Sequence, residues 1–213
     1  MPNTAPPTGN LPGTLLIVAA PSGAGKTSLV RALSESLVGV VVSVSHTTRP
    51  RRPREQEGVH YHFVDDARFQ DMVDAGEFLE YAQVFDRRYG TARASVQHKL
   101  AQGLDVILEI DWQGARQVRQ NLPHCLSIFI LPPSRQALEQ RLRARAQDSE
   151  ETITGRMRAA VQEMRHYDEF DYLVVNDDFN QAVETLKVIV LASRQRLVSQ
   201  AIARLELLGT LLA

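Results

Sequence analysis

The sequence predicts an α/β fold of three layers, in which a mostly parallel core sheet lies between two layers of helices. Short apolar runs, typical of strands that are buried on both faces, recur along the chain. Segments with the periodicity of amphipathic helices separate these runs, as connections between parallel strands require. Of the 213 residues, 44% are hydrophobic and 23% are charged, and these values exclude disordered, collagen-like and coiled-coil proteins.

The first strand and the first helix are expected near the N-terminus. Residues 1–13 are mostly Pro, Asn, Thr and Gly, and we expect them to be a disordered segment. Residues 15–20 (LLIVAA) form an all-apolar run that predicts a buried strand. Residues 27–37 place leucine and valine at helical spacing, so a helix is expected to follow the strand after a glycine-rich turn.

Four more runs complete the predicted sheet: residues 40–44, 106–110, 126–131 and 172–175. The core domain is therefore expected to comprise residues 14–46, 94–134 and 168–213. Two segments fall outside it. Residues 47–93 are polar and rich in Arg and aromatic residues, which predicts a small mixed insert of short strands around one helix at 66–75. Residues 135–167 are helical and rich in Arg, with a break at 147–149.

The C-terminal segment has apolar residues three and four positions apart over 181–208, which predicts a helix packed on the sheet. The same positions could instead meet another subunit, so the sequence leaves both a monomer and a homo-oligomer open.

Charge and cysteine content exclude several classes of protein. The formal net charge of −1 provides no basic field for a nucleic acid or an anionic membrane. The single cysteine, Cys125, cannot form an internal disulfide, and neither a secretory signal nor an apolar run of about 18 residues is found. We therefore expect a cytoplasmic protein that binds neither nucleic acid nor a membrane.

A phosphate-binding turn follows the first predicted strand and consists of Ala20, Pro21, Ser22, Gly23, Ala24, Gly25, Lys26 and Thr27. The P-loop pattern is Gly, four residues, Gly, Lys, and Ser or Thr, and its small residues let backbone N–H groups converge on phosphate oxygens at a helix N-terminus. Here Ala20 replaces the first Gly, which leaves the anion nest open. We expect Lys26 to contact the β and γ phosphates of ATP, and Thr27 to take one position on Mg²⁺. The alternative is a glycine turn that only joins a strand to a helix.

Two carboxylates are expected beside this turn. Residues 105–111 read DVILEID, with Glu109 and Asp111 where the strand emerges from the sheet. Carboxylates in this position can hold Mg²⁺, partly through water. The alternative is the ordinary solvation of a strand end.

The insert contains a group of arginines, Arg49, Arg51, Arg52 and Arg54. Two prolines between them keep the chain extended, so several guanidinium groups can face one small phosphate. Tyr61 and Tyr89 could add hydroxyl donors and cover a base. Taken alone, such an arginine group is more typical of a solvated surface.

Five motifs together resemble guanylate kinase in its bacterial form: SVSHTTRPRR at 43–52, GVHYHF at 58–63, FLEY at 78–81, YGT at 89–91 and IDWQG at 110–114. The resemblance runs from about residue 14 to residue 191. It implies a P-loop kinase with a GMP-binding insert at 47–93 and a helical lid at 135–167. The implied reaction is MgATP plus GMP, or dGMP, giving ADP and the diphosphate.

The resemblance also implies roles for individual residues. The GMP phosphate would be bound by Arg49, Arg52, Tyr61 and Tyr89, and the guanine by Ser45, Glu80 and Thr91, with Asp111 beside the GMP. Arg141, Arg145 and Arg156 would act from the lid, and Asn176 would lie near the adenine. Together with Lys26 and Arg49, the three lid arginines would stabilise charge on the transferred group. For Arg143, by contrast, we expect an exposed position paired with nearby glutamates.

Chemistry supports Glu80 independently of the resemblance. Guanine presents N1–H and N2–H₂ side by side, and one ionised carboxylate can accept from both, whereas adenine offers an acceptor at N1. A buried carboxylate without its donors is strongly penalised, so this residue could discriminate against adenine.

Three departures from the family pattern are Ala20, Glu109 and Ala146, where Gly, Asp and Gly are the commoner residues. Two other functions remain open. One is a P-loop kinase of another phosphorylated acceptor, such as a ribose bisphosphate. The other is a non-catalytic module that binds phosphopeptides in place of GMP. The intact Lys26 and Thr27 disfavour the second, and Glu80 with Ser45 disfavours the first.

Overall fold

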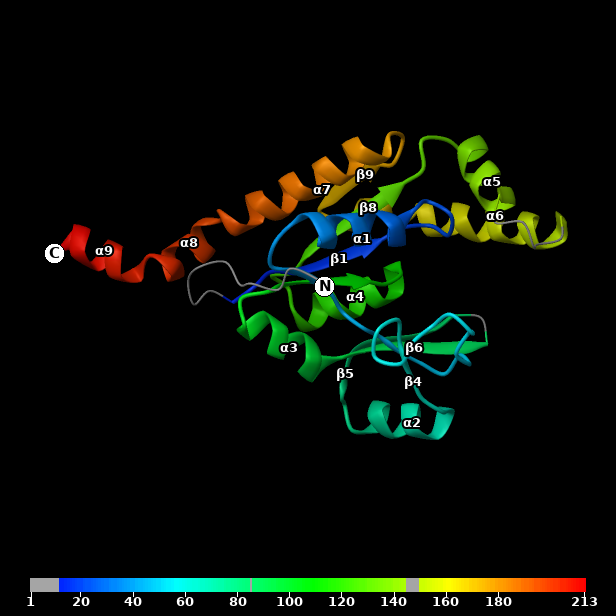
Figure 1. Ribbon diagram of the computed structural model, residues 1–213, viewed down its shortest axis with the longest axis horizontal. Coiled ribbons are helices and arrows are strands. Elements are labelled where there is room, and N and C mark those ends of the chain that lie inside the picture. The colour runs from blue at the N-terminus through cyan, green and yellow to red at the C-terminus, as the bar shows by residue number, and fades with distance from the viewer. Residues whose placement is uncertain (1–11, 85, 145–149) are drawn as a thin grey trace.

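The computed structural model describes residues 12–84, 86–144 and 150–213, and it confirms the predicted three-layer α/β fold (Figure 1). Within these residues the core sheet has five parallel strands in the order β2-β7-β1-β8-β9. The strands are β1 (Leu15–Ala19), β2 (Val40–Val42), β7 (Asp105–Glu109), β8 (Leu126–Leu131) and β9 (Tyr172–Val175). All five predicted runs are strands, and the last two have the predicted bounds.

Helices cover both faces of this sheet: α1 (Lys26–Ser36), α3 (Arg93–Ala101), α4 (Trp112–Asn121) and α7 (Phe179–Arg194). Side chains along β1 alternate between the faces. Leu16 and Val18 pack with α1 and α7, while Leu15 and Ile17 pack with α3 and α4. Because successive side chains of a strand point to opposite faces, an all-apolar strand needs helices on both sides. In Figure 1, α3 and α4 lie below β1, whereas α7 lies in the upper part of the molecule.

The insert forms a second sheet, whose elements are β3 (His46–Thr47), β4 (His62–Phe63), α2 (Asp66–Asp74), β5 (Phe78–Val84) and β6 (Arg87–Ala92). The strand order is β4-β3-β6-β5, with β3 parallel to β4 and antiparallel to β6. Helix α2 packs on this mixed sheet through a small core of Phe69, Met72 and Phe78. Asp65 caps the helix by accepting a hydrogen bond from the Arg68 N–H at 2.7 Å.

Helices α5 (Arg135–Ala144) and α6 (Glu150–Met164) form a pair of their own. Leu138 and Leu142 of α5 pack against Ala160 of α6. A short 3₁₀ helix, η1 (Tyr167–Glu169), then leads to β9. In Figure 1 the pair lies at the end of the molecule opposite the C-terminus. The break expected at 147–149 falls outside the described residues.

The expectation of a single C-terminal helix packed on the sheet is wrong beyond Arg194. Helix α7 buries six residues against the sheet, but α8 (Leu197–Ala203) and α9 (Leu205–Leu212), both fully described, bury none. The 16 residues of α7 span about 24 Å, whereas a five-residue strand spans about 17 Å. Helix α7 therefore already covers the sheet, and α8 and α9 extend past its edge (Figure 1).

Candidate active site

The phosphate cradle, residues 20–27, comprises the loop between β1 and α1 and the first two residues of α1, at the carboxyl end of the core sheet. Gly23 and Gly25 have φ angles of 92° and 95°, a left-handed conformation that glycine adopts without strain. A Cβ on Gly25 would lie 2.5 Å from Nδ2 of Asn176, so this position also lacks space for a side chain. Because Gly25 is the N-cap of α1, the cradle presents backbone N–H groups at the positive end of a helix.

Lys26 reaches across the carboxyl ends of the strands, and its Nζ donates to the carbonyl oxygen of Ile110 at 3.1 Å. Burial lowers the pKa of Lys26. The carboxylates of Glu109, Asp111 and Glu163 act in the opposite direction and favour the charged ammonium. Lys26 is thus a buried cation among carboxylates, at the site where a phosphate would enter.

Thr27, the second residue of α1, lies beside Glu109, the last residue of β7. The Thr27 hydroxyl donates to Oε1 of Glu109 at 2.7 Å. Asp111 begins α4, where its carboxylate accepts from the Gly114 N–H at 2.8 Å. These are the oxygen ligands that Mg²⁺ prefers.

Glu80 is a buried carboxylate that faces this loop from the insert. Its side chain lines the pocket although the residue is only 4% exposed. The Thr91 hydroxyl donates to Glu80 Oε1 at 2.5 Å, and the hydroxyls of Ser45 and Thr91 lie 3.5 Å apart. Burial raises the pKa of Glu80 to about 7, with a further rise from the charge of Asp111 and an opposing effect of the Thr91 hydrogen bond. Glu80 is therefore poised to ionise when donors approach it.

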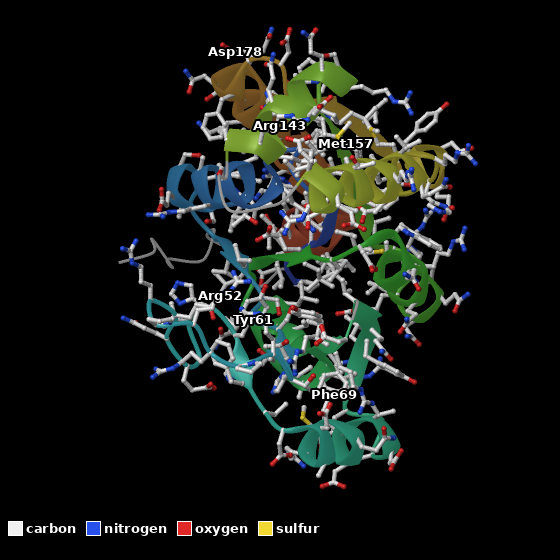
Figure 2. All side chains as sticks on the ribbon, turned by 90° about the vertical axis from the view of Figure 1, so that its right-hand side faces the viewer. Arg52, Tyr61, Phe69, Arg143, Met157 and Asp178 are labelled. Carbon is white, nitrogen blue, oxygen red and sulfur yellow. The ribbon has the colours of Figure 1, made fainter. Side chains whose placement is uncertain are left out.

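Tyr61 and Tyr89 form a wall of the same pocket, with ring centroids 5.9 Å apart in an edge-on arrangement. The Arg49 guanidinium lies 5.4 Å from the Tyr61 ring centre and pairs with Glu55 at 2.7 Å. This hydrogen bond is the main reason why the pKa of Glu55 falls to about 2. Arg52 is exposed, and its backbone N–H donates to Glu55 at 2.9 Å. In Figure 2 Arg52 and Tyr61 lie in the part of the insert nearer the core sheet.

One pocket of about 350 Å³ joins the two sides. The cradle, with Lys26 and Thr27, lines one side, and Tyr61, Glu80 and Tyr89 line the other. The cradle residues that line it are Ala20, Pro21, Ser22, Gly23, Gly25, Lys26 and Thr27. Ser45, Glu109 and Asp111 line it as well, whereas Ala24 is buried in the core. The structure thus brings together most of the predicted phosphate, metal and guanine ligands, with Thr91 directly behind Glu80.

Arg141 and Asn176 contact the cradle instead of the pocket. The Arg141 guanidinium donates to the carbonyl oxygens of Asn176 and Ala24, at 2.9 and 3.5 Å. The buried Asn176 amide donates to the Ala24 carbonyl at 2.8 Å. Both side chains therefore fix the backbone of the cradle from behind.

The remaining lid positions differ from one another. Arg156 is half-buried on α6, whereas Arg145 and Ala146 lie outside the described residues. The expected surface position of Arg143 is confirmed, because it pairs with Glu139 at 2.9 Å and also with Glu150. It is labelled in Figure 2.

Three residues of the site were missed in the sequence. Glu163, on α6, lines the pocket and accepts from the Ser22 N–H at 3.2 Å, and burial raises its pKa. Glu55 holds Arg49, as described above. Gly114 belongs to the IDWQG motif, but its role depends on space: a Cβ there would lie 2.7 Å from Oε2 of Glu80. The contacts of Glu163 and Gly114 join separate elements and have no local sequence signal, whereas Glu55 lies only six positions from Arg49.

Within the described part of the chain, Glu109 and Asp111 do not belong to a larger cluster of metal-binding side chains. Among residues 12–84, 86–144 and 150–213, no three His, Cys, Asp or Glu side chains are grouped to hold a metal ion. In the same part of the chain, no helix has the length and apolar character needed to span a bilayer.

Comparisons with known proteins agree on one family. A model of the Guanylate kinase family matches residues 12–193. A guanylate kinase of Alkalilimnicola ehrlichii is 59% identical over 95% of this chain and 100% of its own, and one of Nitrosococcus oceani is 60% identical over 94% and 98%. The crystal structure of guanylate kinase from Anaplasma phagocytophilum is similar with a TM-score of 0.74 and 31% identity, covering 89% of this chain and 90% of that one.

Proposed function

The chain belongs to the guanylate kinase family and phosphorylates GMP with ATP, and we propose that this reaction takes place in the pocket between the cradle and the insert. The observation that carries this assignment is that Lys26 and Glu80 line one cavity. The nucleophile is an oxygen of the GMP phosphate, which is anionic near neutral pH. Transfer therefore requires positioning and charge neutralisation more than a protein base.

On the ATP side, we propose that the cradle N–H groups and Lys26 bind the β and γ phosphates. Arg141 and Asn176 hold the cradle backbone in place for this contact. The helical lid, residues 135–167, would bring Arg141, Arg145 and Arg156 toward the transferred group and exclude water. Asn176 lies behind the cradle, and we assign it to the support of that loop as much as to the adenine side.

Mg²⁺ fits the oxygen atoms at the end of β7. The Thr27 hydroxyl and the Glu109 carboxylate already lie 2.7 Å apart, and Asp111 lines the same pocket. We propose that these residues hold the ion, partly through water, and that Glu109 serves here as Asp does in other sequences. When bound, Mg²⁺ would neutralise charge on the phosphates.

On the GMP side, residues 47–93 supply the insert that binds the acceptor. The carboxylate of Glu80, supported by Thr91 and Ser45, would accept from N1–H and N2–H₂ of guanine. These groups read the base edge, so dGMP is expected to be accepted as well as GMP. Tyr61 and Tyr89 would bind the GMP phosphate together with Arg49 and Arg52, and Arg49 would then share its guanidinium between Glu55 and the phosphate.

We also propose that a second copy of this chain covers α8 and α9. Their large apolar residues are between 37% and 83% exposed: Leu197, Val198, Ile202, Leu205, Leu207, Leu208, Leu211 and Leu212. Burying such side chains removes on the order of 100 Å² each, and together this approaches the roughly 800 Å² that each partner contributes to a standard interface.

The chemistry of α9 favours another copy over a membrane surface as its partner. Helix α9 carries no Lys or Arg, whereas helices that lie on membranes are rich in both. An apolar pocket lies beside α8, lined among others by Leu122, Cys125 and Ile202, so one copy can both offer and receive apolar side chains. We also propose that the protein is cytoplasmic, because its single cysteine cannot form an internal disulfide. Since the formal net charge is −1, we propose that it does not bind nucleic acid.

The test is a coupled ADP-release assay with MgATP against GMP, dGMP, AMP, UMP, a ribose bisphosphate and a phosphopeptide. We expect turnover with GMP and dGMP only. Lys26→Ala should abolish turnover, because the cradle loses its cation, while GMP still binds in a direct titration. Turnover with the ribose bisphosphate, or normal turnover of Lys26→Ala, would overturn the assignment of this pocket.

A further inference from the structure

Glu163 places a carboxylate inside the phosphate cradle. Its Oε2 accepts a hydrogen bond from the Ser22 backbone N–H at 3.2 Å, and it lines the pocket with Lys26 and Thr27. The charges of Glu163 and Lys26 act on each other. A hydrogen bond from a cradle N–H and the field of the cradle lysine are the contacts expected of a phosphate oxygen. The carboxylate therefore occupies an anion position of the cradle.

The core of the protein, not the tip of the helix pair, fixes the position of Glu163. Its carbonyl oxygen accepts from the His166 N–H at 3.2 Å. The His166 ring stacks on Trp112 of α4, with ring centroids 3.7 Å apart. Glu169 forms two hydrogen bonds of 2.6 Å with Arg116, also on α4. Glu163 thus lies near the C-terminal end of α6, where contacts with α4 hold the backbone in place. Its carboxylate can therefore leave the cradle by rotation of the side chain alone.

Lys26 is held among four carboxylates, of which Glu80 belongs to β5 of the insert. Glu109 ends β7, Asp111 begins α4 and Glu163 comes from α6. Of these, Glu109 accepts from the Thr27 hydroxyl and Asp111 from the Gly114 N–H. Glu163 alone in this set accepts from a backbone N–H of the cradle. Its removal therefore changes the anion nest without removing the magnesium ligands or the α4 cap.

We propose that Glu163 is a placeholder for nucleotide phosphate, which satisfies the cradle when ATP is absent and must be displaced when the phosphates bind. This inference rests on the proposed ATP site. Two anions cannot share one N–H group and one lysine without repulsion. The carboxylate therefore competes with the incoming phosphate and sets the affinity of the cradle, while it offsets the charge of Lys26 in the free enzyme.

The test is Glu163→Gln, which keeps the length of the side chain and an acceptor for Ser22 but removes the charge. Titration calorimetry with ADP and with inorganic tripolyphosphate is expected to give dissociation constants about fivefold to tenfold lower than those of the wild type, because one like charge leaves the anion site. The dissociation constant of GMP should not change. Glu151→Gln, on the exposed face of the same helix, is the matched control and should bind all three ligands like the wild type.

The possible failures are distinguishable. Equal or weaker binding of ADP and tripolyphosphate by Glu163→Gln would overturn the placeholder. Failure of the wild type to bind either probe would overturn the proposed ATP site itself. If Glu163→Gln does not fold, Glu163→Asp draws the carboxylate back from Ser22 and is expected to tighten tripolyphosphate binding in the same direction. Unchanged or weaker binding by that variant would overturn the proposal equally.

Discussion

At the scale of single residues, the site depends on the charge of its buried groups and on the limited space around them. Glu80 is a buried acid whose pKa rises to about 7 because it is desolvated. Gly114 leaves the space that its second oxygen needs, since a Cβ would lie 2.7 Å away. An acid in this state is neutral or ionised according to its neighbours. The guanine of a bound GMP can therefore decide whether Glu80 is neutral or ionised.

Glu80→Gln is expected to raise the dissociation constant of GMP by at least about tenfold at pH 8. Guanine donors favour the ionised carboxylate, so below pH 7 the wild type must lose a proton to bind. The ratio of the variant's constant to that of the wild type should consequently shrink from pH 8 to pH 6. Calorimetric titrations across this range check the prediction.

The titration of the GMP phosphate is common to both proteins and cancels in this ratio. A ratio that stays constant from pH 6 to pH 8 would contradict the assignment of guanine to Glu80.

The stability of the free enzyme depends on pH in the opposite direction from GMP binding: a higher pH favours GMP binding through Glu80 but lowers the free energy of unfolding. The folded state holds this proton more tightly than the unfolded state, so the contribution of Glu80 to stability is lost as pH rises from about 4.5 to about 7.

At the scale of elements, α5 carries two arginines, two positions apart, that make different contacts. Arg141 donates to the carbonyl oxygens of the cradle and of the residue after β9. Arg143 pairs with two glutamates on the surface. Because residues two positions apart on a helix point about 200° away from each other, the two side chains leave α5 on different faces and can have separate roles.

Arg141→Ala and Arg143→Ala form a matched pair of variants. Hydrogen bonds from a charged group are worth about 1.5–3 kcal/mol, so Arg141→Ala is expected to lower kcat/KM for ATP by at least about tenfold. Arg143→Ala should stay within about 0.5 kcal/mol of the wild type in unfolding free energy, with unchanged kinetics. Steady-state assays and chemical denaturation check both. Equal losses in the two variants would show that α5 acts only as a whole.

At the scale of the whole molecule, α8 and α9 extend beyond the sheet and expose eight large apolar side chains. In solution we expect the wild type to be a dimer or a larger assembly at micromolar concentration. A double variant, Leu207→Glu with Leu211→Glu, places two charges four positions apart on α9 and should yield a monomer with unchanged turnover. Sedimentation equilibrium checks this.

The matched control for that experiment is Val188→Glu. Val188 is 64% exposed on α7, nine positions before Leu197 at the start of α8, and its replacement should leave the assembly intact. A monomeric wild type at about 100 μM, well above the Kd range of specific interfaces, would contradict the proposed interface.

Much of the fold followed from local pattern. The buried strands, the glycine turn and the first helix depend on neighbouring residues, and the structure confirms them. The C-terminal helices did not follow, because an apolar stripe at three and four spacing indicates a covered face without indicating what covers it. Helix α7 meets the sheet, whereas α8 and α9 pass its edge.

The sequence by itself determined the cradle, the succession of strands and helices along the chain, and the types of side chain that line the pocket. Each of these features is encoded by residues a few positions apart. Only the tertiary structure decided that Glu163 enters the cradle and that Gly114 makes room for Glu80. The Ser22 to Glu163 contact joins positions 141 residues apart. Such contacts depend on how separate elements pack, and packing leaves no periodic trace in a single chain.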